Sequence, residues 1–119
     1  MRLIIAGSRS FRDYNILVDE VEVLCLACDI KSDELEIISG GAVGADSLGE
    51  IYAQKNNLPL TIMKANWDVH GKSAGMVRNS NMAEVADACI VFWDGESRGS
   101  KNMIDIATKK GLKLFWIMI

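Results

Sequence analysis

Hydrophobic positions along this chain alternate between short continuous runs and stripes with a spacing of three and four residues. Continuous apolar runs bounded by turn residues are typical of strands buried on both faces, whereas the striped spacing indicates amphipathic helices. The continuous runs predict strands over residues Arg2 to Ala6, Leu35 to Ile38, Leu60 to Met63, Ala88 to Phe92 and Lys113 to Met118.

Between these runs, the stripes predict helices over Tyr14 to about Cys28, Ala45 to about Asn56, Ser73 to about Ala86 and Ser100 to Lys110. Asp13, Ser73 and Ser100 are the expected N-caps, because their side chains can accept from the first free backbone N–H groups. Gly111 is expected at the C′ position of the last helix. The third helix is expected to bury Met76 among other residues.

Strands that alternate with helices predict a parallel sheet with helices on both faces. Right-handed crossovers then favour a doubly wound, Rossmann-like α/β fold with strand order 3-2-1-4-5. The length of 119 residues suits one domain over residues 1–119, and the sequence contains no internal repeat.

Composition excludes several classes of protein. The formal net charge of −3 argues against a nucleic-acid partner, because such binding needs a basic face. The longest apolar run, Leu112 to Ile119, is interrupted by Lys113 and is too short to span a membrane. Residues Met1 to Ile5 lead directly into a strand and lack signal-peptide architecture, so we expect a cytoplasmic protein.

Three cysteines agree with that compartment. Cys25 and Cys28 form a C-x-x-C, but both lie on an apolar helical stripe near the C-terminal end of the helix. A redox motif uses a helix N-terminus to lower the thiol pKa, so core packing is favoured over redox or metal chemistry. Cys89 lies in an apolar strand and is interpreted in the same way. No metal site and no cofactor are expected.

The most unusual stretch joins the second strand to the second helix and reads Ser39-Gly40-Gly41-Ala42-Val43-Gly44-Ala45-Asp46. Glycines here admit positive φ angles and a close approach to the main chain, and a helix N-terminus favours an anion. We therefore expect a cradle for a phosphate or phosphorylated sugar. The alternative is a tight turn that merely needs glycine.

Other unusual residues also follow the carboxyl ends of strands, where ligands bind in open parallel sheets. These stretches are Gly7-Ser8-Arg9, Trp67 to Arg78 and Trp93 to Ser100. Arg9 and Arg78 offer guanidinium groups for a phosphate, with surface ion pairs as the alternative. The remaining candidates include tryptophans that could stack on a base or simply pack, and a second small-residue turn around Ser97, Gly99 and Ser100.

Two tempting motifs fail. Gly71-Lys72-Ser73 resembles the end of a Walker A loop, but Asn66 stands where its first glycine should be. Gly41-x-x-Gly44 matches half of a dinucleotide fingerprint, but Ser39 replaces the leading glycine and the next strand ends without the ribose-binding acid. We exclude an ATPase and a typical NAD-dependent dehydrogenase.

Four motifs in order resemble the YspA-type (cpYpsA-related) branch of the SLOG superfamily. They are the opening Gly-Ser-Arg, Ser-Gly-Gly-Ala-x-Gly-Ala-Asp, Trp…Gly-Lys-x-Ala-Gly-x-x-Arg-Asn and Phe-Trp-Asp-Gly-x-Ser-x-Gly-Ser. The resemblance implies a Rossmann-like fold and a pocket for a nucleotide or nucleotide-derived ligand.

The same superfamily contains the LOG phosphoribohydrolases, with which the chain shares part of the motif set. Arg78 keeps their arginine, but Asn79 replaces the following lysine and Asn102 stands at the position of the catalytic glutamate. An amide neither activates water nor stabilises an oxocarbenium-like transition state well, so whether the protein is an enzyme stays open. Arg78 and Asp46 would be catalytic only in that case. DNA-binding relatives of the DprA type are disfavoured by the acidic charge.

The first functional hypothesis is therefore binding, for sensing or sequestration, of a nucleotide-derived small molecule at the carboxyl edge of the sheet. The alternative is a phosphoribohydrolase or nucleosidase that acts on a nucleoside monophosphate or an ADP-ribose-like substrate. The expected ligand-binding residues are Gly7, Ser8, Arg9, Ser39, Gly40, Gly41, Gly44, Ala45, Asp46, Trp67, Arg78, Asn79, Trp93, Asp94, Ser97, Gly99 and Ser100. A homodimer or larger assembly is expected because the apolar strand Leu114 to Ile119 would lie at an edge of the sheet. No membrane partner is expected.

Overall fold

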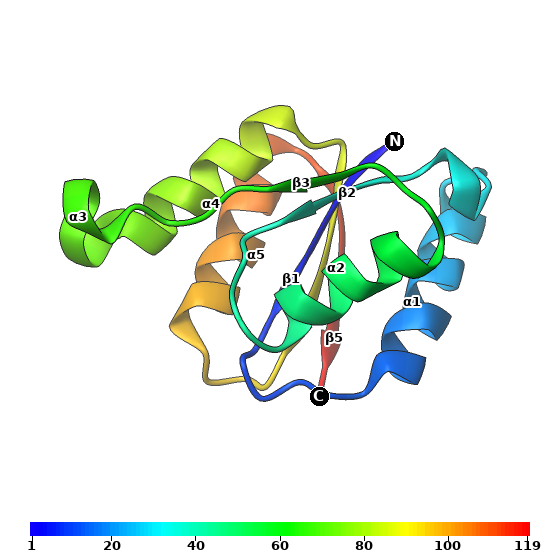
Figure 1. Ribbon diagram of the computed structural model, residues 1–119, viewed down its shortest axis with the longest axis horizontal. Coiled ribbons are helices and arrows are strands. Elements are labelled where there is room, and N and C mark those ends of the chain that lie inside the picture. Colours follow the sequence, from blue (N-terminus) through cyan, green and yellow to red (C-terminus); the bar gives the residue numbers. More distant parts are fainter.

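The computed structural model describes residues Met1–Ile119, and its centre is a parallel five-stranded sheet (Figure 1). The strands are β1 (Arg2–Gly7), β2 (Glu36–Ser39), β3 (Leu60–Ile62), β4 (Ala88–Trp93) and β5 (Lys113–Met118). Their order is β3-β2-β1-β4-β5, which confirms the predicted doubly wound topology. β1 pairs with both β2 and β4 and is therefore the central strand.

Helices cover both faces of this sheet (Figure 1). α1 (Tyr14–Ala27) and α2 (Ala45–Lys55) lie on one face, and α4 (Ala74–Val85) and α5 (Arg98–Lys110) lie on the other. Three short turns of helix complete the chain, namely η1 (Ser32–Glu34), α3 (Trp67–His70) and η2 (Gly71–Ser73).

Two hydrophobic clusters, one on each face of the sheet, hold these layers together. Successive residues of β1 enter opposite clusters, with Leu3 and Ile5 packed under α1 and α2 and Ile4 packed under α4 and α5. All three side chains are fully buried. A continuous apolar run is thus the expected pattern, because the period of two in a strand sends neighbours to faces that are both dry.

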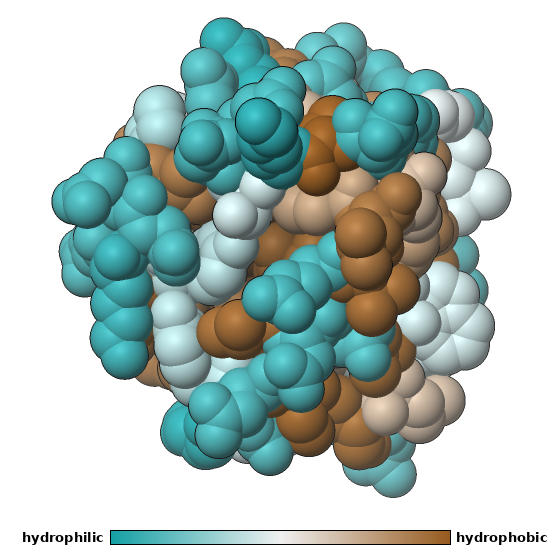
Figure 2. All heavy atoms as spheres, turned by 90° about the vertical axis from the view of Figure 1, so that its right-hand side faces the viewer, coloured by the Kyte–Doolittle hydropathy of each residue, from teal (hydrophilic) through white to brown (hydrophobic).

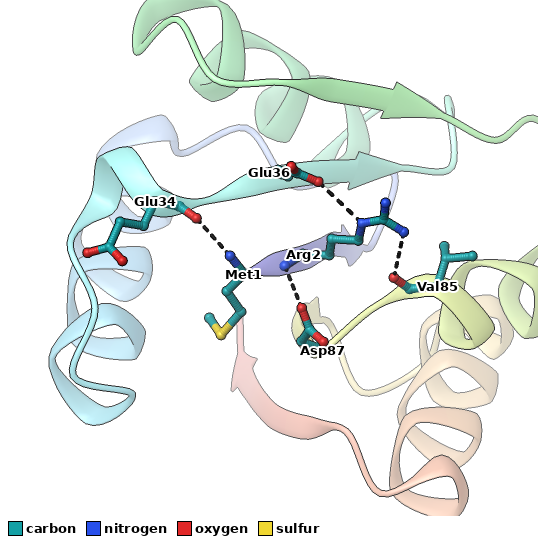
Figure 3. Close-up of polar contacts among 6 residues, drawn as sticks. All are labelled: Met1, Arg2, Glu34, Glu36, Val85 and Asp87. Carbon is teal, nitrogen blue, oxygen red and sulfur yellow. Dashed lines mark hydrogen bonds and ion pairs between the residues drawn. The ribbon is translucent and has the colours of Figure 1, made fainter.

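Polar contacts at the amino end of the sheet tie the strands to one another (Figure 3). Asp87 accepts from the backbone N–H of Arg2 at 2.9 Å, and the Arg2 Nε donates to Glu36 at 3.2 Å. The Met1 amino group donates to the Glu34 carbonyl at 2.7 Å. These groups are exposed to solvent, so each contact contributes little stability.

Helix ends follow the predicted chemistry in part. Asp13 accepts from Ile16 N–H at 3.2 Å and caps α1, and Gly111 ends α5 with a φ of 74°, as predicted. The predicted N-cap Ser100 is wrong. Its backbone N–H instead donates to the Ser97 hydroxyl, so α5 begins at Arg98.

The region before α4 also differs from the prediction. Asn66 caps the short helix α3 by accepting from Val69 N–H, and Ser73 makes no side-chain cap. Met76 is 57% exposed instead of buried, whereas Met82 is almost fully buried. Figure 1 shows that α3 and the start of α4 extend beyond the sheet, and Met76 lies outside the hydrophobic cluster that buries Met82, although Ala74 at the start of α4 is fully buried.

Hydrophobic side chains also reach the surface, and Figure 2 shows hydrophobic atoms between hydrophilic ones on the face that carries α1. On α1 the exposed members are Ile16, Val23 and Leu26. β5 lies at the edge of the sheet, as predicted, with Trp116 and Met118 about half exposed. The assembly expected from this edge stays a prediction. No helix has the length and apolar character needed to cross a membrane.

Candidate functional site

One cleft of about 1190 Å³ lies at the carboxyl edge of the sheet. Its walls come from the turns after β1 and β4, from the start of α2, and from α3, α4 and α5. Among the residues expected from sequence, the cleft is lined by Gly7, Arg9, Asp46, Trp67, Arg78, Asn79, Trp93, Asp94, Ser97, Gly99 and Ser100. Segments distant in the sequence therefore meet at a single hollow.

The other expected residues do not line the cleft and instead support its turns. They are Ser8, Ser39, Gly40, Gly41, Gly44 and Ala45. The fully buried Ser39 hydroxyl donates to the Glu50 carboxylate at 2.6 Å and accepts from Gly41 N–H at 3.1 Å. Ser8 accepts from Asp94 N–H at 3.0 Å and so links the turns after β1 and β4.

The glycines in the turn after β2 are in close contact with other backbone and side-chain atoms of the protein. Gly44 has a φ of 84°, and a Cβ there would collide with the Ser8 carbonyl oxygen. A Cβ on Gly40 would lie 2.5 Å from Nη1 of Arg78 and 2.7 Å from a carboxylate oxygen of Asp46. Glycine at these two positions therefore lets neighbouring backbone and side chains pack closely.

The Asp46 carboxylate, near the start of α2, turns back onto the glycine turn after β2. Its Oδ2 accepts from Ala42 N–H at 3.2 Å, and the residue is only 5% exposed. Burial raises its pKa from 3.8 to about 6, and the Ala42 N–H and the Arg78 guanidinium oppose that rise. The cradle expected for an external phosphate thus already holds a carboxylate of the chain.

A second carboxylate organises the turn before α5. Asp94 Oδ1 accepts from the backbone N–H groups of Glu96 and Ser97 at 2.9 and 2.8 Å, and these bonds lower its pKa. Nearby, the Trp93 indole donates to the Ser97 carbonyl at 3.1 Å and packs edge-to-face on Trp116. Trp93 is therefore held in place as part of the cleft wall. No group of acidic, histidine or cysteine side chains is placed to hold a metal ion.

Basic and apolar side chains that were not among the predicted ligand-binding residues also line the cleft. They include Lys72, Arg98, Lys101 and Met76. Lys101 pairs with Asp105 at 2.8 Å, whereas Lys72 and Arg98 make no ion pair, and neither does Arg9. Lys72 and Arg98 do fall within the stretches that follow strands and were predicted to meet at the carboxyl edge. The residue type alone, however, does not distinguish a basic side chain that lines a cleft from one that lies elsewhere on the surface.

Arg78 and Asn79 lie on the floor of the cleft. Nη1 of Arg78 donates to the Gly40 carbonyl at 2.6 Å, and its Nε donates to Oδ1 of Asn79 at 3.0 Å. The Asn79 amide donates in turn to Oδ1 of Asn102 at 2.9 Å and to the Gly99 carbonyl at 3.3 Å. Asn102, which stands at the expected glutamate position, is an acceptor in this set of contacts.

The chain belongs to the YspA, cpYpsA-related SLOG family, whose family model matches residues 1–70. It is also 32% identical to the Gene 61 protein of Mycobacterium phage D29, over 93% of this chain and 91% of that protein. The family predicted from the motifs is confirmed.

Two solved structures share the fold. DNA processing protein A (DprA) from Streptococcus pneumoniae matches with a TM-score of 0.72 at 20% identity, over 97% of this chain and 49% of that one. DprA from Helicobacter pylori, whose structure is described for its single-stranded DNA binding mode, matches with a TM-score of 0.68 at 21% identity, over 98% of this chain and 64% of that one. The chain thus spans about half of one of these proteins and about two thirds of the other, and the likeness confirms the Rossmann-like fold.

These comparisons correct two predictions. The neighbours are DNA processing proteins, which contradicts both the predicted binding of a nucleotide-derived small molecule and the phosphoribohydrolase alternative. They also contradict the expectation that nucleic acid is an improbable partner. The prediction relied on the net charge of −3, which sums over the whole surface, whereas the cleft itself is lined by five basic side chains (Arg9, Lys72, Arg78, Arg98 and Lys101) and four acidic ones (Asp46, Asp94, Glu96 and Asp105).

Proposed function

We propose that this protein binds single-stranded DNA in the cleft at the carboxyl edge of its sheet. The observation that supports this most directly is the combination of tryptophan and basic side chains around one hollow. Trp67, which is 56% exposed, and Trp93 offer faces for unstacked bases, and Arg9, Lys72 and Arg98 offer cations for phosphates. Stacking platforms beside a basic track are typical of proteins that bind single strands.

The size of the cleft supports a strand over a single small molecule. Pockets for small ligands span about 300–1,000 Å³ and bury most of the ligand. The volume of about 1190 Å³ exceeds that range. A single strand can present its bases to the tryptophans, whereas a duplex keeps its bases stacked inside, so we expect the single strand to bind better.

Local charge supports the same proposal despite the negative total. Asp46 and Asp94, two carboxylates of the cleft, already accept backbone N–H groups, and Asp105 pairs with Lys101. The basic groups of Arg9 and Lys72 have no carboxylate partner. Phosphate oxygens can therefore pair with cations that are otherwise satisfied only by water.

Fluorescence anisotropy with labelled oligothymidylates of increasing length, at about 50 mM salt, tests the proposal. We expect binding that weakens steeply with salt and quenches tryptophan fluorescence. Arg98→Ala should weaken it several-fold, whereas Lys109→Ala, an equally exposed cation in the last turn of the same helix, should leave it nearly unchanged. Absence of binding at low salt, or equal affinity for a duplex, would refute the proposal.

We further propose that the protein acts in the cytoplasm. Support comes from its thiols, because Cys25, Cys28 and Cys89 are all free and two of them are buried. Proteins of oxidising compartments instead pair their cysteines. Fractionation of cells that produce the protein, with a compartment marker in each fraction, tests this location.

A further inference from the structure

The buried side-chain amide of Asn79 forms hydrogen bonds with several neighbouring groups at the floor of the cleft. It is 5% exposed and touches three other groups, which belong to Arg78, Gly99 and Asn102. We infer that Asn79 is a positioning residue, which holds the Arg78 guanidinium and the first turn of α5 in the arrangement that receives the phosphate backbone. This inference rests on the proposed binding of single-stranded DNA.

The orientation of this amide follows from its partners. The Nε of Arg78 can only donate, so the Asn79 atom that faces it at 3.0 Å is the carbonyl oxygen. The amide nitrogen then faces α5, where two acceptors lie within 3.3 Å. A leucine of similar shape would satisfy neither side, and an aspartate would lack the donor. Asparagine at this position therefore supplies both the acceptor for Arg78 and the donor for the two groups on α5.

A continuous series of hydrogen bonds results, and it crosses the cleft floor from wall to wall. It runs from the Gly40 carbonyl through Arg78 and Asn79 to the Gly99 carbonyl. Gly40 belongs to the turn before α2, and Gly99 lies in the first turn of α5. The same contacts that orient the guanidinium therefore also set the separation of the two turns.

Two of the three nitrogens of Arg78 are used in this series, which leaves Nη2 for an external oxyanion. With its Nε released, the guanidinium would be held only at Nη1 and would rotate about its long side chain. A charge that is spread over several rotamers neutralises a given phosphate less completely. Removal of the Asn79 side chain should therefore weaken the neutralisation of a DNA phosphate as removal of the Arg78 guanidinium does.

The salt dependence of oligothymidylate binding tests this directly, because each neutralised phosphate of a single strand contributes about 0.7 to the slope of log affinity against log salt. Asn79→Ala removes no charge, yet we expect its slope to fall by about 0.7, as in Arg78→Ala. The double variant should show no further fall. Asn81→Ala, the same change at an exposed position of the same helix, should keep the wild-type slope. A weakened affinity with an unchanged slope in Asn79→Ala would overturn the inference.

A second measurement needs no DNA. In ¹⁵N NMR spectra, the Nε–H of Arg78 should exchange slowly with solvent in the wild type and quickly in Asn79→Ala. Asn102→Ala, which removes one acceptor from a half-exposed site, should show an intermediate rate and serves if Asn79→Ala does not fold. If the wild type binds no strand, the proposed function fails. If Arg78 Nε–H stays protected in Asn79→Ala, the positioning role fails.

Discussion

Replacement of Asp46 by asparagine should change how the stability of the protein depends on pH. The carboxylate is buried beneath the cleft, and burial raises its pKa from 3.8 to about 6 in the folded state. In the unfolded chain the group returns to its ordinary pKa. The folded state therefore holds the proton more tightly than the unfolded state does.

The sign of the effect follows from this difference. The stabilisation from the protonated carboxyl is fully present below about pH 4 and is lost as the pH rises through about 6. A rise in pKa from 3.8 to about 6 corresponds to about 3 kcal/mol of unfolding free energy. Asp46→Asn removes the titration and keeps an oxygen for the Ala42 N–H. Relative to the wild type, the variant should gain about 3 kcal/mol between about pH 4 and pH 7.5.

Urea unfolding followed by tryptophan fluorescence, at a series of pH values, measures the difference between the two proteins. The quantity to compare is the difference in unfolding free energy between the two proteins at each pH, because the other carboxyl groups titrate equally in both. Asp19→Asn, at an exposed position in the middle of α1, is the matched control and should run parallel to the wild type. Parallel curves for Asp46→Asn and the wild type would show that the buried carboxylate is not destabilised, and the reasoning would be refuted.

Three further changes test other parts of the structure. Ionised Asp46 places a negative charge on the cleft floor, so affinity for single-stranded DNA should rise as the pH falls through about 6, whereas Asp46→Asn should bind with no such step in an anisotropy titration. Trp67→Ala should weaken binding by about 1–3 kcal/mol with little change in Tm, because the indole is 56% exposed; an unchanged Kd would exclude it as a stacking platform. Gly44→Ala should cost about 2–4 kcal/mol in urea unfolding because a Cβ both strains its φ and collides with backbone, whereas Gly111→Ala, with open space around it, should cost about 1 kcal/mol; equal losses would contradict the steric argument.

The net charge of the whole chain is a poor guide to what binds at one cleft. A sum over all residues weights Glu20 on α1 equally with Arg98 in the cleft, although only the second can meet a ligand there. At physiological ionic strength, charges separated by more than about 8 Å are largely screened from each other. Binding is therefore governed by the charges that line the cleft, and their selection depends on the folded arrangement.

The sequence by itself determined the layers and their order. Leu3, Ile4 and Ile5 form an unbroken apolar run, and only a strand that is dry on both faces requires one. Asp13 and Gly111 specify helix ends through contacts with their immediate neighbours. Such features depend on residues close in the chain, so their outcome is the same wherever the rest of the protein lies.

Only the tertiary structure decided what the residues at the cleft do. Met76 has a helical spacing that suits burial, but it lies where α4 extends past the sheet, so no core reaches it. Asp46 and Asn79 are both polar residues on helices, yet Asp46 is buried under the glycine turn and Arg78, and Asn79 is buried between Arg78 and α5. These positions depend on contacts between segments distant in the sequence, and local periodicity contains no information about which segments will meet.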